Sequence, residues 1–260
     1  MFRRRSPARL PRPSVSAATI RQASAERLAT AFSAPPEDAA PWVEAAAKYG
    51  MPRAMVFWGH FLLDGLGRVP QDRAAACAWF RIAASVGEVE GMNMLGRCLE
   101  NGWGVAIDEA EATRWFARAA KAGLDWAQYN LGNMLLQGRG IEEDRAVALH
   151  WYRAAAAQGH AKSINMVARF LEEGWDGPAD PEGAARLYAL SAERGDFRGQ
   201  FNLGTLLTAQ GRIDEAAHWF RAAAQGAHEA FRHSMAERLA ARPEPELRAV
   251  AAKIPRGGSA

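Results

Sequence analysis

The chain contains little cysteine and no long apolar run. Only 2 of its 260 residues are cysteine, whereas a disulfide-stapled scaffold needs many at regular spacing, so this class is excluded. Cys77 and Cys98 are expected to be two small buried residues inside helices. A membrane-spanning helix needs a run of about 18 or more apolar residues. The sequence has no such run and therefore predicts no membrane insertion.

An excess of charge is also missing from most of the chain. The formal net charge is +3. Residues 1–50 hold 8 Lys and Arg against 4 Asp and Glu, which leaves 24 against 25 for residues 51–260 out of totals of 32 and 29. A nucleic-acid-binding body gathers positive charge on one face. We therefore expect no nucleic-acid partner for residues 51–260.

Motifs that carry catalysis or hold a cofactor are absent as well. The sequence has no Gly-x-Ser-x-Gly elbow and no phosphate loop ending in Gly-Lys-Ser or Gly-Lys-Thr. His228 and His233 resemble a zinc-protease pair, but a spacing of five residues places them about 140° apart around a helix rather than on one face. We predict no catalytic residue, no cofactor and no metal site.

What the chain has in abundance is an internal repeat. The pattern Ala-Ala-x-x-Gly, or a close variant, returns at intervals of 37, 36, 36 and 36 residues, and a last glycine follows after 31. A period of this size indicates stacked helical units, each of which buries its apolar face only against its neighbours. The glycines that close the pattern are Gly50, Gly87, Gly123, Gly159, Gly195 and Gly226.

Each unit is expected to be a pair of helices in close contact. A glycine inside the first helix costs about 1 kcal/mol relative to alanine, so its recurrence implies a position where a side chain would obstruct the contact. An aromatic pair recurs in the second helix and is expected to form core together with the alanines beside it. The glycine column is Gly59, Gly96, Gly132, Ala168 and Gly204, and the aromatic column is Trp79-Phe80, Trp115-Phe116, Trp151-Tyr152, Leu187-Tyr188 and Trp219-Phe220.

The connection between the two helices of a unit carries a Gly-x-Gly sequence, as in Gly102 and Gly104. Glycine just past a helix end adopts the left-handed conformation that closes the helix. These loops lie between helices rather than after a strand, so they are expected to be helix ends and not a dinucleotide site.

An aspartate recurs every 36 residues where the second helix begins. Aspartate is favoured at a helix N-cap because its side chain accepts a hydrogen bond from a free amide of the first turn. Asp108 with Glu111 matches the capping-box pattern, and Asp180 precedes Pro181, which suits the first helical position. Equivalent residues of successive units lie on the order of 10 Å or more apart, too far to share a metal ion. The aspartates are Asp72, Asp108, Asp144 and Asp180.

These columns agree in phase, and together they resemble the Sel1-like repeat, a relative of the tetratricopeptide repeat. The resemblance covers about residues 40–241. It implies an all-α solenoid, a right-handed superhelix of stacked antiparallel helix pairs whose first helices line a concave face. The expected divisions are a disordered basic N-terminal arm (1–36), a solenoid (37–241) with repeats at about 53–87, 90–123, 126–159, 162–195 and 198–226 and a capping helix at 227–241, and a C-terminal tail (242–260) with room for a short helix.

The N-terminal arm leaves two interpretations open. It is rich in arginine, contains serine and has no acidic residue before Glu26, as in a mitochondrial targeting segment. It also fits a basic tail, which we favour. Within the arm, the spacing of the apolar residues Ile20, Leu28 and Phe32 leaves room for one short amphipathic helix over residues 19–32. No apolar stretch follows the arginines, so a secretory signal is not expected. The expected compartment is the cytoplasm, with organelle import through the arm as the alternative.

The resemblance implies a non-catalytic adaptor that holds a protein or peptide in the concave groove of the array. Two other functions stay open. One is a hydrolytic or β-lactam-binding protein, as the resemblance to disulfide-rich relatives suggests, although the shortage of cysteine speaks against it. The other is a structural array that forms homo-oligomers through exposed apolar loop residues such as Trp103 and Trp175.

If the first helices line the groove, the non-core positions beside the glycine column face it. Asparagine side chains pair with both the amide and the carbonyl of an extended peptide, and arginine forks onto a carboxylate. A simple family preference for asparagine in the phrase Tyr-Asn-Leu-Gly explains part of the pattern equally well. The candidate groove residues are His60, Arg97, Asn130, Asn133, Gln137, Arg169 and Asn202.

Overall fold

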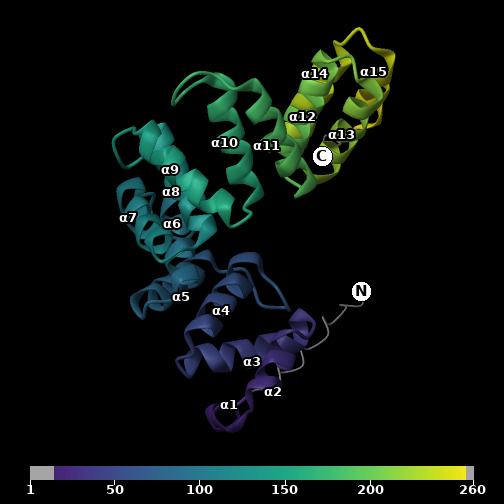
Figure 1. Ribbon diagram of the computed structural model, residues 1–260. Coiled ribbons are helices and arrows are strands. Elements are labelled where there is room, and N and C mark those ends of the chain that lie inside the picture. The colour runs from purple at the N-terminus through teal and green to yellow at the C-terminus, as the bar shows by residue number, and fades with distance from the viewer. Residues whose placement is uncertain (1–14, 256–260) are drawn as a thin grey trace, which may run out of the picture. The chain divides into compact units, whose positions relative to one another are not determined.

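The computed structural model describes residues 15–255, and this range contains fifteen α-helices and no strand (Figure 1). Apart from the first helix, which packs on the third, each helix packs most extensively on a neighbour in sequence, and short connections make the paired helices antiparallel. The prediction of an all-α fold built from stacked helix pairs is confirmed. No helix in the described range is long and apolar enough to cross a bilayer.

The chain divides into two compact units, which we call the N-terminal unit (Met1–Ala122) and the C-terminal unit (Gly123–Ala260). In the N-terminal unit, α4 pairs with α5 and α6 pairs with α7. Its helices are α1 (Ala17–Gln22), α2 (Ala25–Phe32), α3 (Pro36–Lys48), α4 (Pro52–Asp64), α5 (Arg73–Ser85), α6 (Val89–Asn101) and α7 (Glu109–Lys121).

The C-terminal unit contains three further pairs, α8 with α9, α10 with α11 and α12 with α13, followed by two more helices. The last helix, α15, falls in the tail for which the sequence left room for a short helix. The helices are α8 (Asp125–Gln137), α9 (Arg145–Ala157), α10 (Ala161–Glu173), α11 (Pro181–Glu193), α12 (Phe197–Ala209), α13 (Ile213–Gly226), α14 (Glu229–Ala240) and α15 (Pro245–Lys253).

The structure differs from the predicted disorder of the N-terminal arm. Within residues 15–36 it places α1 and α2, which both contact α3. Ile20 is 3% exposed, and the ring of Phe32 meets that of Phe57 edge-on at 5.9 Å. These few apolar side chains are enough to pack the two short helices against the rest of the unit, although the segment as a whole is basic and rich in proline. The disorder predicted for residues 1–14 lies outside the described residues.

The glycine column lies beneath the second aromatic ring of each pair. A Cβ atom built on Gly96 would lie 2.6 Å from the ring of Phe116, and one on Gly132 would lie 2.7 Å from the ring of Tyr152. Both distances are well inside van der Waals contact, so the predicted close approach of the two helices is confirmed. The same contact joins Gly59 to Phe80 and Gly204 to Phe220, and Ala168 and Tyr188 belong to one buried cluster.

Only the second member of each aromatic pair is fully buried. Phe80 and Phe116 are 0% exposed, whereas Trp79 and Trp115 are half-buried. The prediction that both members form core is confirmed for the second member and holds only in part for the first, since Leu187 and Trp219 are partly buried side chains packed against the core. Adjacent residues of a helix point about 100° apart, so one pair cannot direct both rings into the same contact.

The four recurring aspartates cap the second helices as predicted. The Oδ1 atom of Asp108 accepts a hydrogen bond from the backbone amide of Glu111 at 2.8 Å, and Asp144 accepts one from the amide of Val147 at 2.9 Å. These bonds satisfy an amide that has no partner within its own helix. Asp72 and Asp180 make the same bond to Ala75 and Gly183.

The capping box predicted at Asp108 is only half formed. The Glu111 side chain does not return to the Asp108 amide but accepts a hydrogen bond from the indole of Trp115 at 3.2 Å. The Asp108 amide is already engaged, because it donates to the carbonyl of Leu99 in α6 at 3.0 Å. A tertiary hydrogen bond therefore replaces the local one.

We expect Asp144→Ala to lower the free energy of unfolding by about 1 kcal/mol, because it leaves the first turn of α9 without an acceptor. Asp144→Asn retains a side-chain oxygen and is expected to lose much less. Urea denaturation followed by circular dichroism measures both. Asp214→Ala, which removes an acid from the first turn of α13 outside a cap position, serves as control. Equal losses in Asp144→Ala and Asp144→Asn would contradict the capping role.

Candidate functional site

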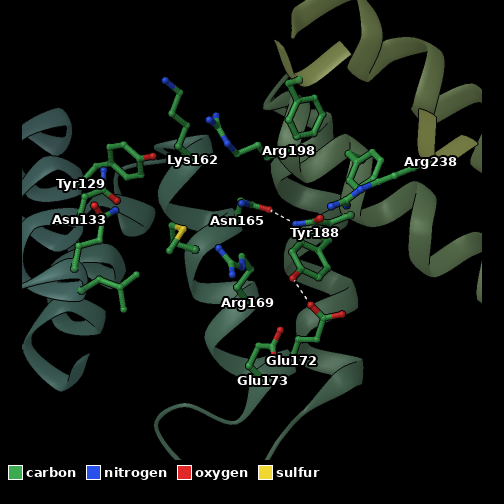
Figure 2. A pocket seen from close by; sticks show the side chains of 16 residues that line it. Tyr129, Asn133, Lys162, Asn165, Arg169, Glu172, Glu173, Tyr188, Arg198 and Arg238 are labelled. Atoms are coloured by element: carbon green, nitrogen blue, oxygen red, sulfur yellow. Dashed lines mark hydrogen bonds between the residues drawn. The ribbon is translucent and has the colours of Figure 1, made fainter. Parts of the chain in front are cut away.

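A groove of about 560 Å³ lies within the C-terminal unit (Figure 2). The first helices of three successive pairs, α8, α10 and α12, supply most of its lining, and α11 and α14 supply the rest. Four of the seven candidate residues predicted from the sequence line this groove. They are Asn133 and Gln137 from α8, Arg169 from α10 and Asn202 from α12.

The other three candidates do not line the groove. Asn130 is half-buried on α8. His60 and Arg97 belong to the N-terminal unit. The His60 ring meets Phe80 at 5.4 Å, and desolvation lowers the pKa of His60. The guanidinium of Arg97 lies 4.8 Å from the centroid of the Trp103 ring.

Three arginines line the groove with their guanidinium groups placed against aromatic rings. The Arg198 Cζ atom lies 4.4 Å from the ring centroid of Phe197. Arg169 lies 5.2 Å from the ring of Trp175, and Arg238 lies 5.8 Å from the ring of another groove residue, Phe201. Over residues 15–255, none of these three guanidinium groups forms an ion pair. A cation–π contact holds each guanidinium group against its ring while leaving N–H groups available to a ligand.

Asparagine side chains in the groove are oriented by hydrogen bonds to their carbonyl oxygens. Tyr152 donates from its hydroxyl to Asn133 Oδ1 at 2.8 Å, and burial raises the pKa of Tyr152, which keeps it a donor. Asn202 donates from Nδ2 to Asn165 Oδ1 at 2.9 Å (Figure 2). Because these two carbonyl oxygens are engaged, Asn133 and Asn165 are left with side-chain NH₂ groups that can donate to a ligand.

Among the described residues, acidic side chains enter the groove only near the C-terminal end of α10, where Glu172 and Glu173 lie. The hydroxyl of the buried Tyr188 donates to Glu172 at 2.5 Å (Figure 2). The pKa of Tyr188 is raised mainly by burial and to a lesser extent by this hydrogen bond. One of the two carboxylates is thus already engaged by a side chain of its own unit.

Sequence reasoning missed Lys162, Asn165, Tyr188, Arg198 and Arg238 as groove residues. One signal was available, since Lys162 and Arg198 are separated by one 36-residue period and occupy the second position of α10 and α12. Arg238 has no equivalent in the other repeats, because it comes from α14, the helix that follows the last pair. Tyr188 was assigned to core, and it is both buried and part of the groove wall.

A buried histidine lies at the N-terminus of α10. His160 is 7% exposed, and its ring lies 4.6 Å from that of Trp126 and 5.1 Å from that of Tyr129. Its Nδ1 atom is 2.8 Å from the Ser163 hydroxyl, whereas the buried Nε2 has no hydrogen-bond partner among residues 15–255. Desolvation lowers the pKa of His160 from its ordinary value of 6.5.

The protein is therefore expected to lose stability as the pH falls below about 6.5. In this range the unfolded chain binds a proton at residue 160 more readily than the folded chain, so acid favours unfolding. The charges of Asp125 and Asp196 oppose the shift and that of Lys162 supports it. Melting temperatures between pH 7 and 5 are expected to fall less steeply in His160→Gln than in wild type. The exposed control His218→Gln should retain the wild-type slope, and parallel slopes in all three proteins would refute the assignment.

The two cysteines are buried and free, as predicted. The neighbouring Cys77 thiol and burial together raise the pKa of the Cys98 thiol. Across the described part of the chain, no three His, Cys, Asp or Glu side chains gather where a metal ion could bind.

The two loop tryptophans are not the exposed residues that the sequence suggested. Trp103 and Trp175 are both half-buried. The Trp175 ring meets that of Phe170 at 5.1 Å, and arginine side chains cover both indoles. The basis for self-association through these residues is thereby weakened, because the loops fold back onto their own helices.

A family model described as the Sel1 repeat matches residues 52–88, 89–124, 127–160, 161–196 and 198–228. The chain belongs to the Sel1 repeat family. The resemblance found in the sequence is therefore confirmed. Sel1 repeat proteins generally act as protein-interaction scaffolds. No curated protein matches the chain.

Several solved structures share this fold. The Sel1 repeat chain is 28% identical to c5321, a protective antigen present in uropathogenic Escherichia coli strains, with a TM-score of 0.68 over 82% of this chain and 47% of that one. It thus spans about half of that antigen's length. A Sel1 repeat protein from Oxalobacter formigenes is 24% identical, with a TM-score of 0.62 over 86% of this chain and 90% of its own. The immunity protein Pa5087 from Pseudomonas aeruginosa, at 13% identity and a TM-score of 0.55 over 76% of this chain and 75% of its own, shows the fold alone.

Proposed function

We propose that this Sel1 repeat protein is a non-catalytic scaffold that binds an extended segment of a partner protein in the groove of its C-terminal unit. The observation that carries the proposal is the convergence of Asn133, Gln137, Arg169 and Asn202 on one groove of about 560 Å³. These residues were selected from the sequence, by their position relative to the repeat and by the ability of their side chains to bind a peptide. Their side chains come from the first helices of three successive pairs. A binding surface that runs along stacked repeats is built in this way.

The chemistry of the groove suits a peptide backbone. Asn133 and Asn165 present amide donors beside the half-buried rings of Tyr129 and Phe201. Donors at fixed positions pair with the carbonyl groups of an extended chain, while aromatic faces cover its apolar side chains. The scaffold role of the family supports the same function.

The experiment is a selection from a random peptide display library on the purified full chain. Selected peptides are then measured against two tryptophan variants. Gln137→Trp places a bulky ring in the groove, whereas Leu190→Trp places one on the exposed part of α11 outside the groove. Filling the site is expected to weaken binding about tenfold or more, which corresponds to about 1.4 kcal/mol, while the control stays at the wild-type affinity.

Equal binding by wild type and Gln137→Trp would overturn the proposal, as would a selection that enriches no peptide. Circular dichroism spectra of the variants are compared first, so that a loss of binding is not a loss of fold.

A further inference from the structure

We infer that the segment held in this groove is acidic, with glutamate or aspartate side chains bound by Arg169, Arg198 and Arg238. This inference rests on the proposed function and specifies its ligand. It follows from three features of the groove: its charge, its unpaired guanidinium groups and its surplus of hydrogen-bond donors.

The groove concentrates positive charge that the rest of the repeat body lacks. Four cationic side chains line it, namely Lys162 and the three arginines, against two acidic ones, Glu172 and Glu173. Over residues 51–260 as a whole, Lys and Arg number 24 against 25 Asp and Glu. The local excess is therefore a property of this surface and not of the composition, and it attracts an anionic partner.

The three arginines are prepared to bind carboxylates. Each lies over an aromatic ring, at 4.4–5.8 Å, and none forms an ion pair within the described residues. A guanidinium already held against a ring loses less conformational entropy on binding, and its planar fork of N–H groups matches a carboxylate in two parallel hydrogen bonds. Arg169 and Arg198 are half-buried, so their interactions with a ligand are less screened than those of fully exposed charges.

The neutral groups of the groove favour the same kind of ligand. The carbonyl oxygens of Asn133 and Asn165 are engaged by Tyr152 and Asn202, which leaves their NH₂ groups as donors. Of the two acceptor-rich carboxylates in the groove, Glu172 already accepts from Tyr188. A ligand rich in acceptors, such as an acidic peptide, complements this distribution.

The charges are also arranged along the groove. Lys162 and Arg198 lie in the first turns of α10 and α12, where the helix dipole is positive, and Glu172 and Glu173 lie at the C-terminal end of α10 (Figure 2). Arg169 lies between these two ends of α10. The acidic part of the bound segment is therefore expected to extend from the N-terminal ends of α10 and α12 as far as Arg169.

The test uses fluorescein-labelled peptides of equal length with alternating Glu-Ala, Gln-Ala or Lys-Ala sequences, and a single-stranded oligonucleotide as a second anion. Fluorescence anisotropy is measured with the full chain. The Glu-Ala peptide is expected to bind about tenfold or more tightly than the Gln-Ala peptide, and more weakly as salt rises. Groove specificity is tested with the triple variant Arg169→Gln, Arg198→Gln, Arg238→Gln against the charge-matched control Arg153→Gln, Arg186→Gln, Arg221→Gln.

The groove triple variant is expected to lose the preference for Glu-Ala, and the control triple variant to retain it. Equal losses in both would overturn the inference, because general charge would then explain the binding. Tighter arginine-dependent binding of the oligonucleotide than of the Glu-Ala peptide would overturn it as well. Library peptides that bind in a Gln137→Trp-sensitive manner without enrichment of acidic residues would refute the acidic ligand while leaving the peptide-binding function intact.

Discussion

Gly104→Ala is expected to destabilise the N-terminal unit strongly, whereas Gly87→Ala is expected to have a much smaller effect. Both glycines have positive φ angles, 73° and 89°, so both substitutions impose a left-handed conformation on alanine. This conformation costs about 1–2 kcal/mol. The positions differ in their surroundings, because a Cβ at Gly87 meets open space and one at Gly104 overlaps the carbonyl oxygen of Arg73.

The overlap at Gly104 involves backbone, which cannot rotate away as a side chain can. The loop after α6 must then move off the N-terminal end of α5, and overpacking of this kind costs about 1–3 kcal/mol more. We therefore expect Gly104→Ala to lose about 2–5 kcal/mol in total. Gly67 lies against the carbonyl of Pro36 in the same way, so the contact recurs in the repeat.

Urea denaturation of the two variants measures this difference directly. A loss in Gly104→Ala no larger than that in Gly87→Ala would show that the loop does not pack on α5. Because stacked repeats can unfold in more than one step, the transitions followed by circular dichroism and by tryptophan fluorescence are compared before a free energy is assigned.

Phe116→Ala is expected to lower the free energy of unfolding by about 3–5 kcal/mol, because the ring is fully buried and its removal leaves a cavity between α6 and α7. Gly96→Val is expected to cost about 1–3 kcal/mol for the opposite reason, since its side chain would enter the space of that ring. A side chain at position 96 and the ring at position 116 would therefore occupy the same space between α6 and α7.

The double variant Gly96→Val, Phe116→Ala is expected to be more stable than the sum of the single losses implies. The valine side chain at position 96 would occupy part of the cavity left at position 116. A double-mutant cycle in urea measures the coupling, which for residues in contact is about 0.5–3 kcal/mol. Arg114→Val, which changes an exposed residue of α7, provides a control expected to be additive with Phe116→Ala. Additivity in the Gly96 cycle would contradict the contact.

Part of the groove lining could be predicted by comparing equivalent positions of the repeats. This comparison identified Asn133, Gln137, Arg169 and Asn202, because residues at equivalent positions of the first helices lie on the same side of the array. It could not select Arg238, which belongs to a helix outside the repeat pattern. It also included His60, which packs against Phe80 in the other unit.

Hydrogen bonding was predictable where it is local. Each aspartate cap joins residues three positions apart, so the sequence contains both partners. The capping box at Asp108 failed because the amide of Asp108 donates to Leu99, nine residues away in another helix. A motif specifies which bonds are available, and a competing tertiary partner decides which one forms.

The sequence by itself determined the repeat, the all-α pairing of helices, the capped helix starts and the glycine positions at helix contacts. These features depend on the spacing of residues within one repeat unit, and the same spacing recurs in each successive unit. Only the tertiary structure decided that residues 15–36 form two helices that pack on α3, that the second aromatic of each pair alone is fully buried, and that three arginines held against aromatic rings line one groove. Those features depend on which side chains from different helices meet, and the distances between helices are set by packing that no local pattern encodes.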